Sequence, residues 1–161
     1  MCIRDRLDAI NDGDEMVSST SIRRLLQAGA FAKAIQRLGH PYRLTGTVVR
    51  GAGRGRDLGF PTANLEQIAV LVPGDGVYAA AANIDGMIRP VAVNIGPNPT
   101  FGEQQRKVEC HVPGYSGNLY GATLDVDLTH QIRGLVQFES VDSLRDQITK
   151  DVAEVIALAD R

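Results

Sequence analysis

A glycine- and arginine-rich segment, GAGRGRDLGFPTAN, occupies residues 51–64 and is the stretch of this sequence best suited to binding phosphate. Glycine has no Cβ, so a loop of this kind lets backbone N–H groups approach a ligand and form a concave anion site. Two arginines add positive charge beside these groups. The residues of this candidate phosphate loop are Gly51, Gly53, Arg54, Gly55, Arg56, Gly59 and Pro61.

Thr62 and Asn64 follow the loop directly. If residues 61–64 are extended, the two side chains point to the same side of the chain. Hydroxyl and carboxamide oxygens are hard donors that Mg²⁺ accepts, usually together with substrate phosphates and water. The alternative is a glycine-rich turn in which both side chains bond to the local backbone. The residue types leave both interpretations open.

The segment matches neither of the two common nucleotide-binding fingerprints. A P-loop requires G-x-x-x-x-G-K-[ST], and no lysine stands in that position. A dinucleotide fingerprint requires G-x-G-x-x-G opening a helix, which the glycine spacing does not fit. Pro61 also biases Phe60 away from helical geometry, so no helix is expected after the loop. These two classes of nucleotide-binding protein are therefore disfavoured.

A candidate general base lies in the segment RKVECHV, residues 106–112. Its apolar residues alternate with Glu109 and His111, which therefore share the opposite face of an extended strand. A carboxylate in a partly closed site can act as a base near neutral pH. The alternative is a solvated strand face with two polar residues, and the residues alone favour it.

The elements that must position these residues are mainly strands. Six stretches rich in β-branched residues or alternating in polarity are separated by glycine and proline, which is typical of an antiparallel barrel or sandwich. Asp85-Gly86 between two apolar runs predicts a β-hairpin. The expected strands cover residues 42–50, 76–84, 87–95, 106–112, 122–130 and 132–138.

Helices are expected at both ends of the chain. Residues 17–40 contain good N-cap residues and two glycine stops, at Gly29 and Gly39, which predict two short helices. Near the C-terminus, apolar residues spaced by three and four form one stripe of a helix that should cover the sheet. That stripe consists of Val141, Leu144, Ile148, Val152 and Val155.

The composition restricts the function further. The formal net charge of the 161 residues is −2, which gives little support to a nucleic-acid binder. Two cysteines without a C-x-x-C partner make a zinc site unlikely and exclude a disulfide framework. Neither a membrane-spanning apolar run nor a secretion signal is present, so a cytoplasmic location is expected and no membrane partner. Residues 1–6 are interpreted as a non-native artefact.

The segment GRGRDLGFPTANL resembles the signature of the riboflavin kinases. Further stretches agree in the same order, and the resemblance covers roughly residues 40–158. These stretches are PGDGVYAA (73–80), AVNIGPNPTF (92–101), VECHV (108–112) and NLYGATLDVDL (118–128). The resemblance implies a mainly β fold, a six-stranded antiparallel Greek-key-like barrel with a C-terminal amphipathic helix and a short helical N-terminal remnant.

The resemblance also implies a reaction and its residues. ATP would phosphorylate the 5′-hydroxyl of riboflavin to give FMN, so the two small molecules are the expected partners. The candidate phosphate loop with Thr62 and Asn64 would bind ATP, and these two residues would hold Mg²⁺. Glu109 would be the catalytic base, and Tyr120 and Arg133 would lie on the flavin side.

The segment VSSTSIRRLLQAG (17–29) resembles the last motif of the adenylyltransferase module of bacterial bifunctional FAD synthetases. The H-x-G-H motif of that module is absent, so adenylyltransferase activity is not expected. The predicted domains are a remnant of that module with a linker, residues 1–40, and a riboflavin kinase domain, residues 41–161. The oligomeric state is not predicted.

One segment departs from the family pattern. VPGYSGNLYG (112–121) replaces the usual Leu-Leu-Asp-Phe and a following acidic residue, in a loop that the resemblance implies closes over the flavin. The difference bears on riboflavin affinity and loop closure. Two alternatives to a kinase therefore stay open: a non-catalytic flavin- or nucleotide-binding module of the same fold, and a regulatory domain whose loop binds an anion on a partner.

Overall fold

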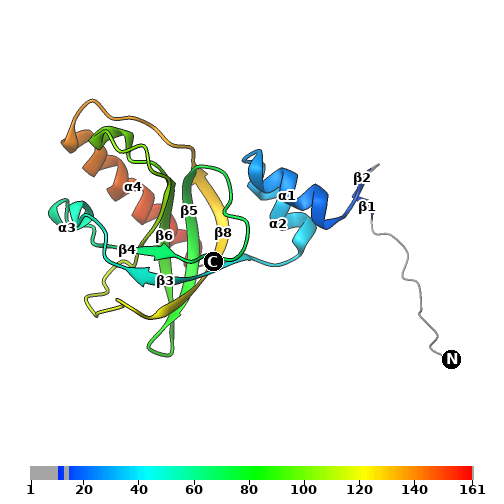
Figure 1. Cartoon of the computed structure of the whole chain (residues 1–161), viewed down its shortest axis with the longest axis horizontal. Helices are drawn as coiled ribbons and strands as arrows, with labels where there is room; N and C mark the ends of the chain where they lie inside the picture. The colour runs from blue at the N-terminus through cyan, green and yellow to red at the C-terminus, as the bar shows by residue number, and fades with distance from the viewer. Residues whose placement is uncertain (1–10, 13–14, 161) are drawn as a thin grey trace.

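Six antiparallel strands close into a barrel in the order β3-β4-β7-β6-β5-β8 (Figure 1). The computed structural model describes residues 11–12 and 15–160, so the interpretation of residues 1–6 lies outside the described residues. The pairing of β4 with β7 and of β3 with β8 gives the expected Greek-key-like order. The barrel strands are β3 Tyr42–Val49, β4 Thr62–Glu66, β5 Gly76–Ile84, β6 Met87–Gly96, β7 Lys107–His111 and β8 Thr123–Arg133. Two short strands, β1 Asn11–Asp12 and β2 Glu15–Met16, pair outside it.

The predicted barrel is confirmed, but one of its six strands was wrongly placed. Residues 132–138 do not form a separate strand, because β8 continues to Arg133 and residues 134–138 have no regular structure. Arg133 pairs with Val77, the second residue of β5. Almost no residue of β5 is therefore left to pair with a strand that continues after Arg133. The sixth strand is instead β4, formed by the residues that follow the phosphate loop.

The hairpin predicted at Asp85-Gly86 joins β5 to β6. Both turn residues have positive φ angles, 55° and 78°, as a two-residue type I′ turn requires. Glycine adopts this conformation without strain, and aspartate is among the residues that tolerate it best. This tight turn fixes the register of β5 against β6, and thereby the position of every β6 side chain, including Asn94.

Alternate residues of the strands fill the barrel interior. Cys110 is 1% exposed and belongs to this core, where burial raises the pKa of its thiol to about 12. It therefore acts as a small apolar side chain. The fully buried strand residues include Leu44, Val48, Tyr78, Val91, Val93, Ile95, Val126 and Leu128. Their neighbours in sequence, such as Asn94 and Glu109, consequently lie on the outer wall of the barrel.

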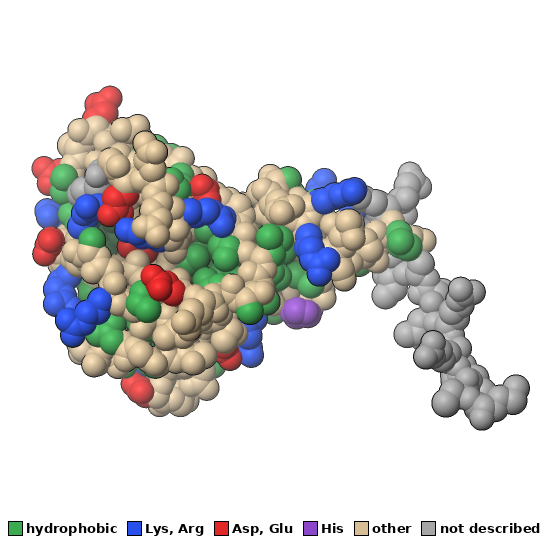
Figure 2. Space-filling view, viewed as in Figure 1, with side chains coloured by type: hydrophobic (Ala, Val, Ile, Leu, Met, Phe, Trp, Pro, Cys, Tyr) green, Lys and Arg blue, Asp and Glu red, His purple; other side chains and the backbone are tan. Residues whose placement is uncertain are grey.

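Two helices near the N-terminus, α1 Ser19–Gln27 and α2 Phe31–Leu38, pack onto the barrel and share its core. Ser18 caps α1 through a capping box with Ser21. The ring of Phe31 meets that of Tyr78 edge to face at 5.0 Å. Figure 2 shows hydrophobic side chains where this helical segment meets the barrel. The two predicted helices are confirmed, and they belong to the barrel's hydrophobic core.

The C-terminal helix α4, Val141–Ala159, lies along the outside of the barrel against β5 and β6 (Figure 1). Ser140 caps it with a second capping box. Val155 is fully buried and packs with Ala79 and Ala92, while Val141 at the other end of the predicted stripe is exposed. The amphipathic helix is confirmed as a cover of the barrel wall. No described helix is long and apolar enough to cross a membrane.

An exposed ion pair across two barrel strands makes stability depend on pH. Arg43 on β3 and Asp127 on β8 are register partners, and two of their N–O distances are 2.7 Å. The hydrogen bond from Arg43 holds the pKa of Asp127 below its ordinary value of 3.8. The stabilisation is therefore present above pH 3.8 and is lost as the pH falls through the lowered pKa.

We expect Asp127→Asn to lower Tm by about 2 °C or less at neutral pH, because the pair is solvent-exposed. The difference from wild type should shrink at about pH 2.5, because protonation of Asp127 at low pH removes the ion pair. Thermal unfolding followed by circular dichroism at the two pH values measures this. A Tm difference that is the same at both would show that the ion pair is not its cause.

Candidate active site

Strand register brings polar residues from distant parts of the chain into one row on the barrel's outer wall. Glu109 on β7 is the Cα partner of Asn64 on β4 and of Asn94 on β6. The row continues through Val77 on β5 to Arg133 on β8. Residues directly opposite one another on paired strands project from the same face of a sheet. The candidate base, a candidate metal ligand and Arg133 therefore share one surface.

A cavity of about 140 Å³ lies over this wall, between the barrel, the phosphate loop and α4. Apolar atoms make up most of its surface, and Glu109 and Thr62 are among its polar residues. We call it the Glu109 cavity. It is lined by Ala52, Gly53, Arg54, Gly55, Leu58, Phe60, Thr62, Val77, Ala92, Asn94, Asn98, Glu103, Lys107, Glu109, His111, Arg133, Leu144, Ile148, Asp151 and Val152. An apolar pocket with a few convergent polar groups is the usual form of a small-molecule site.

The carboxylate of Glu109 has a defined hydrogen-bond partner. Asn98 donates from Nδ2 to Glu109 Oε2 at 2.9 Å, and Asn94 donates to Asn98 Oδ1 at 3.4 Å. Among the described residues, Asn98 makes the only side-chain hydrogen bond to Glu109. Glu109 is partly buried, and one of its oxygens stays available to accept a proton from a substrate.

The phosphate loop is compact and depends on glycine. Gly53 and Gly59 have φ angles of 79° and 90°, which side-chain-bearing residues rarely adopt. Between them lies a single helical turn, α3 Arg54–Asp57, and Phe60 N donates to Gly55 O at 2.7 Å. After the loop the chain enters β4, so the expectation that no helix follows it is confirmed.

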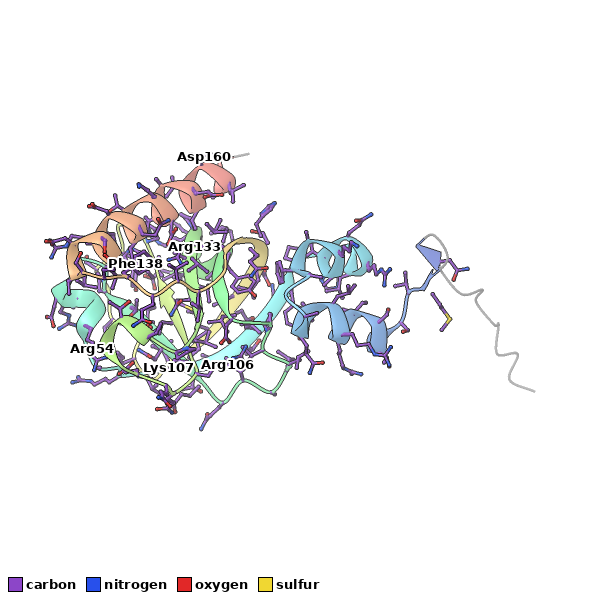
Figure 3. All side chains as sticks on the ribbon, turned by 90° about the horizontal axis from the view of Figure 1, so that it is seen from above. Arg54, Arg106, Lys107, Arg133, Phe138 and Asp160 are labelled. Atoms are coloured by element: carbon purple, nitrogen blue, oxygen red, sulfur yellow. The ribbon has the colours of Figure 1, made fainter. Side chains whose placement is uncertain are left out.

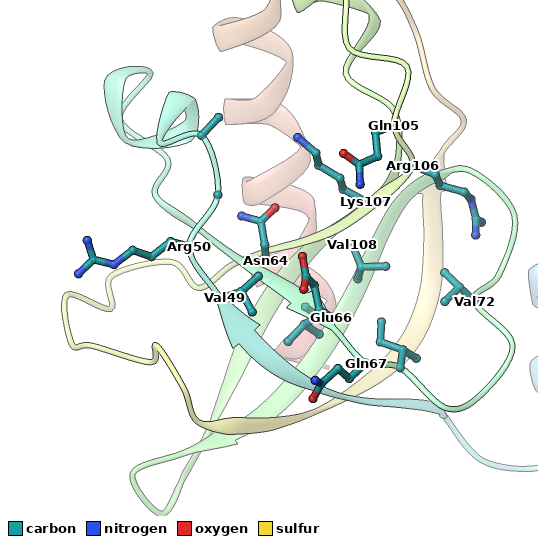
Figure 4. A pocket seen from close by; sticks show the side chains of 14 residues that line it. Val49, Arg50, Asn64, Glu66, Gln67, Val72, Gln105, Arg106, Lys107 and Val108 are labelled. Atoms are coloured by element: carbon teal, nitrogen blue, oxygen red, sulfur yellow. The ribbon is translucent and has the colours of Figure 1, made fainter.

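The loop backbone lies directly against Thr62 and Asn64. A Cβ at Gly51 would overlap Asn64 Nδ2 and lie 2.8 Å from its Cγ. A Cβ at Gly55 would overlap the carbonyl oxygen of Phe60 and lie 3.1 Å from Thr62 Oγ1. The two glycines therefore allow a close approach that no larger residue permits. Figure 4 shows Asn64 between Arg50 and Lys107.

Thr62 and Asn64 share the outer face of β4, and their oxygens suit a hard cation. Asn64 is only 8% exposed, and within residues 15–160 its side chain makes no hydrogen bond to protein. The amide borders an open cavity and is not sealed in the core, so water or a ligand can supply its hydrogen bonds. In the same residues, no group of three or more His, Cys, Asp or Glu is placed to hold a metal. A cation here would need phosphate or water oxygens as well.

Two cations near the loop, Arg54 and Lys107, are paired with one carboxylate, that of Glu103. Arg54 Nη1 lies 2.8 Å from Glu103 Oε1, and Lys107 Nζ lies 2.9 Å from Glu103 Oε2. The hydrogen bond from Lys107 is the main cause that lowers the pKa of Glu103. Figure 3 shows Arg54 and Lys107 among the side chains of this end of the barrel. The positive charge expected beside the loop is present, partly neutralised by Glu103.

Lys107 also joins the Glu109 cavity to a larger open one of about 630 Å³ (Figure 4). Its lining includes Gly51, Asn64, Glu66 and Arg106. The predicted loop residues are thus spread along the edges of several cavities. Gly53, Arg54, Gly55 and Thr62 line the Glu109 cavity, Gly51 and Asn64 line the open one, and Gly59 lines neither of these two.

Arg133 and Tyr120, predicted together on the flavin side, lie in different cavities. Arg133 lines the Glu109 cavity, where its guanidinium makes hydrogen bonds of 2.7 and 3.0 Å to Asp151 Oδ2 on α4. Its guanidinium also stands 5.7 Å from the ring centre of Phe138 (Figure 3). Tyr120 is half exposed and lines a cavity of about 100 Å³. That cavity, which we call the Tyr120 cavity, also contains Arg56, Pro61 and Thr62.

The loop that departs from the family pattern is attached to the β5–β6 hairpin. Tyr115 donates from its hydroxyl to Asp85 Oδ2 at 3.2 Å, and the guanidinium of Arg89 lies 5.4 Å from its ring centre. Tyr115 also packs against the barrel core. These contacts of Tyr115 anchor the loop to the β5–β6 hairpin.

The residues that sequence patterns did not single out are Glu103, Lys107 and Asp151. Lys107 lies in RKVECHV and Asp151 on the predicted C-terminal helix, but strand alternation and the apolar stripe single out other residues of those segments; Glu103 lies in a segment without a motif. Asn98 also bonds the candidate base. Its place in the segment AVNIGPNPTF was a signal, but its partner is set by the pairing of β6 with β7.

Comparison with known proteins agrees with these observations. The family model for riboflavin kinase, Flavokinase, matches residues 38–159. Bifunctional riboflavin kinase/FMN adenylyltransferases are similar to the chain: that of Bacillus subtilis is 36% identical over 154 residues, covering 93% of this chain and 49% of the relative. That of Pseudomonas fluorescens is 39% identical over 144 residues, with 89% and 46% covered. The chain thus spans about half the length of the curated relatives it matches.

Two solved structures share the architecture. A structure described as a macrolide-efflux protein from Streptococcus pneumoniae is 33% identical, with a TM-score of 0.79 over 90% of this chain and 48% of that chain. A riboflavin kinase from Trypanosoma brucei is 24% identical, with a TM-score of 0.52 over 76% of this chain and 82% of that chain. At this identity the second supports the fold alone.

Proposed function

The chain belongs to the riboflavin kinase family, and on this basis we propose that it transfers the γ-phosphoryl group of ATP to the 5′-hydroxyl of riboflavin, giving FMN. The observation that carries the proposal is that Glu109, Thr62 and the loop around Gly53 line one cavity. Phosphoryl transfer asks a protein mainly to position its substrates and to neutralise charge, and these residues supply both functions.

Glu109 acts as the general base in this proposal. Its partly buried carboxylate lies at the cavity wall, and Asn98 occupies only one of its oxygens. The other oxygen accepts the proton of the riboflavin hydroxyl as the phosphoryl group is transferred. A positioned base of this kind typically contributes a factor of about 10²–10⁴ to the rate.

The phosphate loop holds ATP through its backbone N–H groups and through Arg54 and Arg56. Thr62 and Asn64 would hold Mg²⁺ beside the phosphates, because their oxygens are hard donors and the backbone at Gly51 and Gly55 approaches them closely. When bound, the cation neutralises charge on the phosphate oxygens. The Arg54–Glu103 pair then exchanges, at least in part, for contacts of Arg54 with phosphate.

The two substrates meet at Thr62, which lines both the Glu109 cavity and the Tyr120 cavity. The apolar walls of the Glu109 cavity and its base suit the flavin and its hydroxyl chain, with Arg133 at one side. The Tyr120 cavity, with Arg56 beside it, suits the nucleotide. We therefore keep Arg133 on the flavin side and place Tyr120 on the nucleotide side.

Residues 1–40 are proposed to be a remnant of an FMN adenylyltransferase module with its linker, and residues 41–161 the kinase domain. The similarity to bifunctional relatives, of which the chain spans about half, supports this division. The sequence of these 161 residues contains no H-x-G-H, so we propose that this chain makes FMN and does not adenylylate it.

Incubation of the purified chain with riboflavin, ATP and Mg²⁺ tests the proposal, with FMN separated by chromatography and detected by fluorescence. We expect FMN that depends on both ATP and Mg²⁺, and omission of each is the control. Binding of riboflavin and ATP without any FMN would contradict the proposal and favour the non-catalytic binding module. The presence of Glu109 and Thr62 in one cavity argues against that alternative.

A further inference from the structure

We propose that Asn98 is a positioning residue for Glu109: its side-chain amide fixes one carboxylate oxygen so that the other serves the substrate hydroxyl. The inference rests on the proposed function, since it assigns the residue that orients the proposed base. Its foundation is the 2.9 Å hydrogen bond from Asn98 Nδ2 to Glu109 Oε2.

The chemistry around Asn98 determines the orientation of its amide. Nδ2 faces two carboxylates, Glu109 Oε2 at 2.9 Å and Glu103 Oε2 at 3.5 Å. The opposite orientation would direct the carbonyl oxygen of Asn98 at two anions that have no proton to donate. On its other side, Asn98 Oδ1 accepts from Asn94 Nδ2 at 3.4 Å. Both ends of the amide therefore have suitable partners in one orientation only.

The segment that carries Asn98 is held in place by its own contacts. Asn98 precedes a turn of 3₁₀-helix, Pro99–Phe101, and its carbonyl oxygen accepts from the backbone N–H of Glu103 at 3.2 Å. Thr100 accepts from the backbone N–H of Phe138 at 3.3 Å, which ties the turn to the segment after β8. A side chain carried on such a fixed turn can set the direction of its partner.

Asn98 also stands between the proposed base and the phosphate side of the site. Its second carboxylate neighbour, Glu103, is the one that pairs with Arg54 of the phosphate loop and with Lys107. The two N–H groups of one amide can serve the two carboxylates, and thereby keep Glu103 and Glu109 in fixed relation. We infer that Asn98 aligns the base with the loop that holds the phosphates.

Two substitutions separate positioning from general support of the fold. Asn98→Leu removes the donor at similar volume, and we expect kcat to fall about tenfold to hundredfold while both KM values stay within about threefold. Asn98→Asp keeps the shape but places a third carboxylate beside Glu103 and Glu109. We expect a larger loss at about pH 8, partly recovered at about pH 6, because neighbouring carboxylates can share a proton.

The other charged groups of the cavity must be the same in every variant for this pH comparison. They are Arg54, Glu103, Lys107, His111, Arg133 and Asp151, and all are left unchanged. Asn83→Leu, an exposed position on β5 outside the cavities described above, is the matched control and should keep the wild-type kcat and pH profile. Circular dichroism and Tm establish that each variant is folded.

Steady-state kinetics of FMN formation from about pH 6 to pH 8 gives the answer. The inference is overturned if Asn98→Leu keeps kcat within about twofold of wild type, or if Asn98→Asp follows the wild-type pH profile. If Asn98→Leu does not fold, the pH profile of the isosteric Asn98→Asp decides alone. If the wild-type chain forms no FMN, the proposed function and this inference both fail. If it forms FMN and either of these Asn98 results is found, only this inference fails.

Discussion

Glu109→Gln is expected to lower kcat for FMN formation by about 10²–10⁴-fold and to leave the Kd for ATP within about twofold of wild type. Glutamine has nearly the same shape and can still accept the hydrogen bond that Asn98 donates at 2.9 Å, so the geometry of the cavity should persist. What is lost is the ability to take a proton from the substrate hydroxyl. Single-turnover kinetics and calorimetric titration with ATP measure the two quantities separately.

The control for this variant is Glu154→Gln, which changes the same chemical group on the exposed face of α4 and should leave both quantities at their wild-type values. Equal losses of turnover and of ATP affinity in Glu109→Gln would remove Glu109 from the role of base. That pattern would indicate that its carboxylate supports the structure of the site instead.

Much of the fold was predictable because local rules determine it. Asp85-Gly86 can adopt the two positive φ angles of a type I′ turn, so the hairpin and its register follow from a dipeptide. The apolar stripe of α4 and the serine capping box at Ser140 likewise depend on neighbours within one or two turns. Alternation in an extended segment was enough to put Thr62 and Asn64 on one face.

The composition of the site was less predictable, because it depends on register between strands far apart in sequence. Glu109 meets Asn64 only because β4 pairs with β7, and the sequence alternation of each strand does not specify that pairing. The same holds for Arg133, whose partner Asp151 comes from a helix that packs across the wall. The strand misplaced at residues 132–138 has the same origin, since an apolar run forms a strand only where a partner remains unpaired.

The glycines of the phosphate loop include one kind that local backbone conformation explains and one that a contact with a distant residue explains. Positive φ angles at Gly53 and Gly59 agree with what a glycine-rich turn suggests from sequence alone. The need for glycine at position 51 has a different cause, because its φ is ordinary and only the side chain of Asn64, thirteen residues later, excludes a Cβ there. A structural reason therefore links the first residue of GAGRGRDLGFPTAN to its last.

That link leads to the prediction for Mg²⁺. Asn64→Ala removes the proposed carboxamide ligand, and we expect the Mg²⁺ concentration for half-maximal activity to rise about tenfold or more, since even indirect partners of a metal commonly contribute that much. Gly51→Ala should shift the titration in the same direction, because the added Cβ displaces the Asn64 side chain without removing its oxygen. Neither variant should change Mg²⁺-free binding of riboflavin.

The measurement is calorimetric titration of ATP at a series of Mg²⁺ concentrations, alongside the kinetic titration, so that the result does not depend on turnover. Asn83→Ala is the control, because Asn83 is an exposed asparagine on β5 that lines none of the three cavities. If Asn64→Ala leaves both Mg²⁺ titrations unchanged, Asn64 is not a ligand. A shift in Gly51→Ala alone would then show that the loop backbone, rather than the carboxamide, sets the affinity for the nucleotide and its cation.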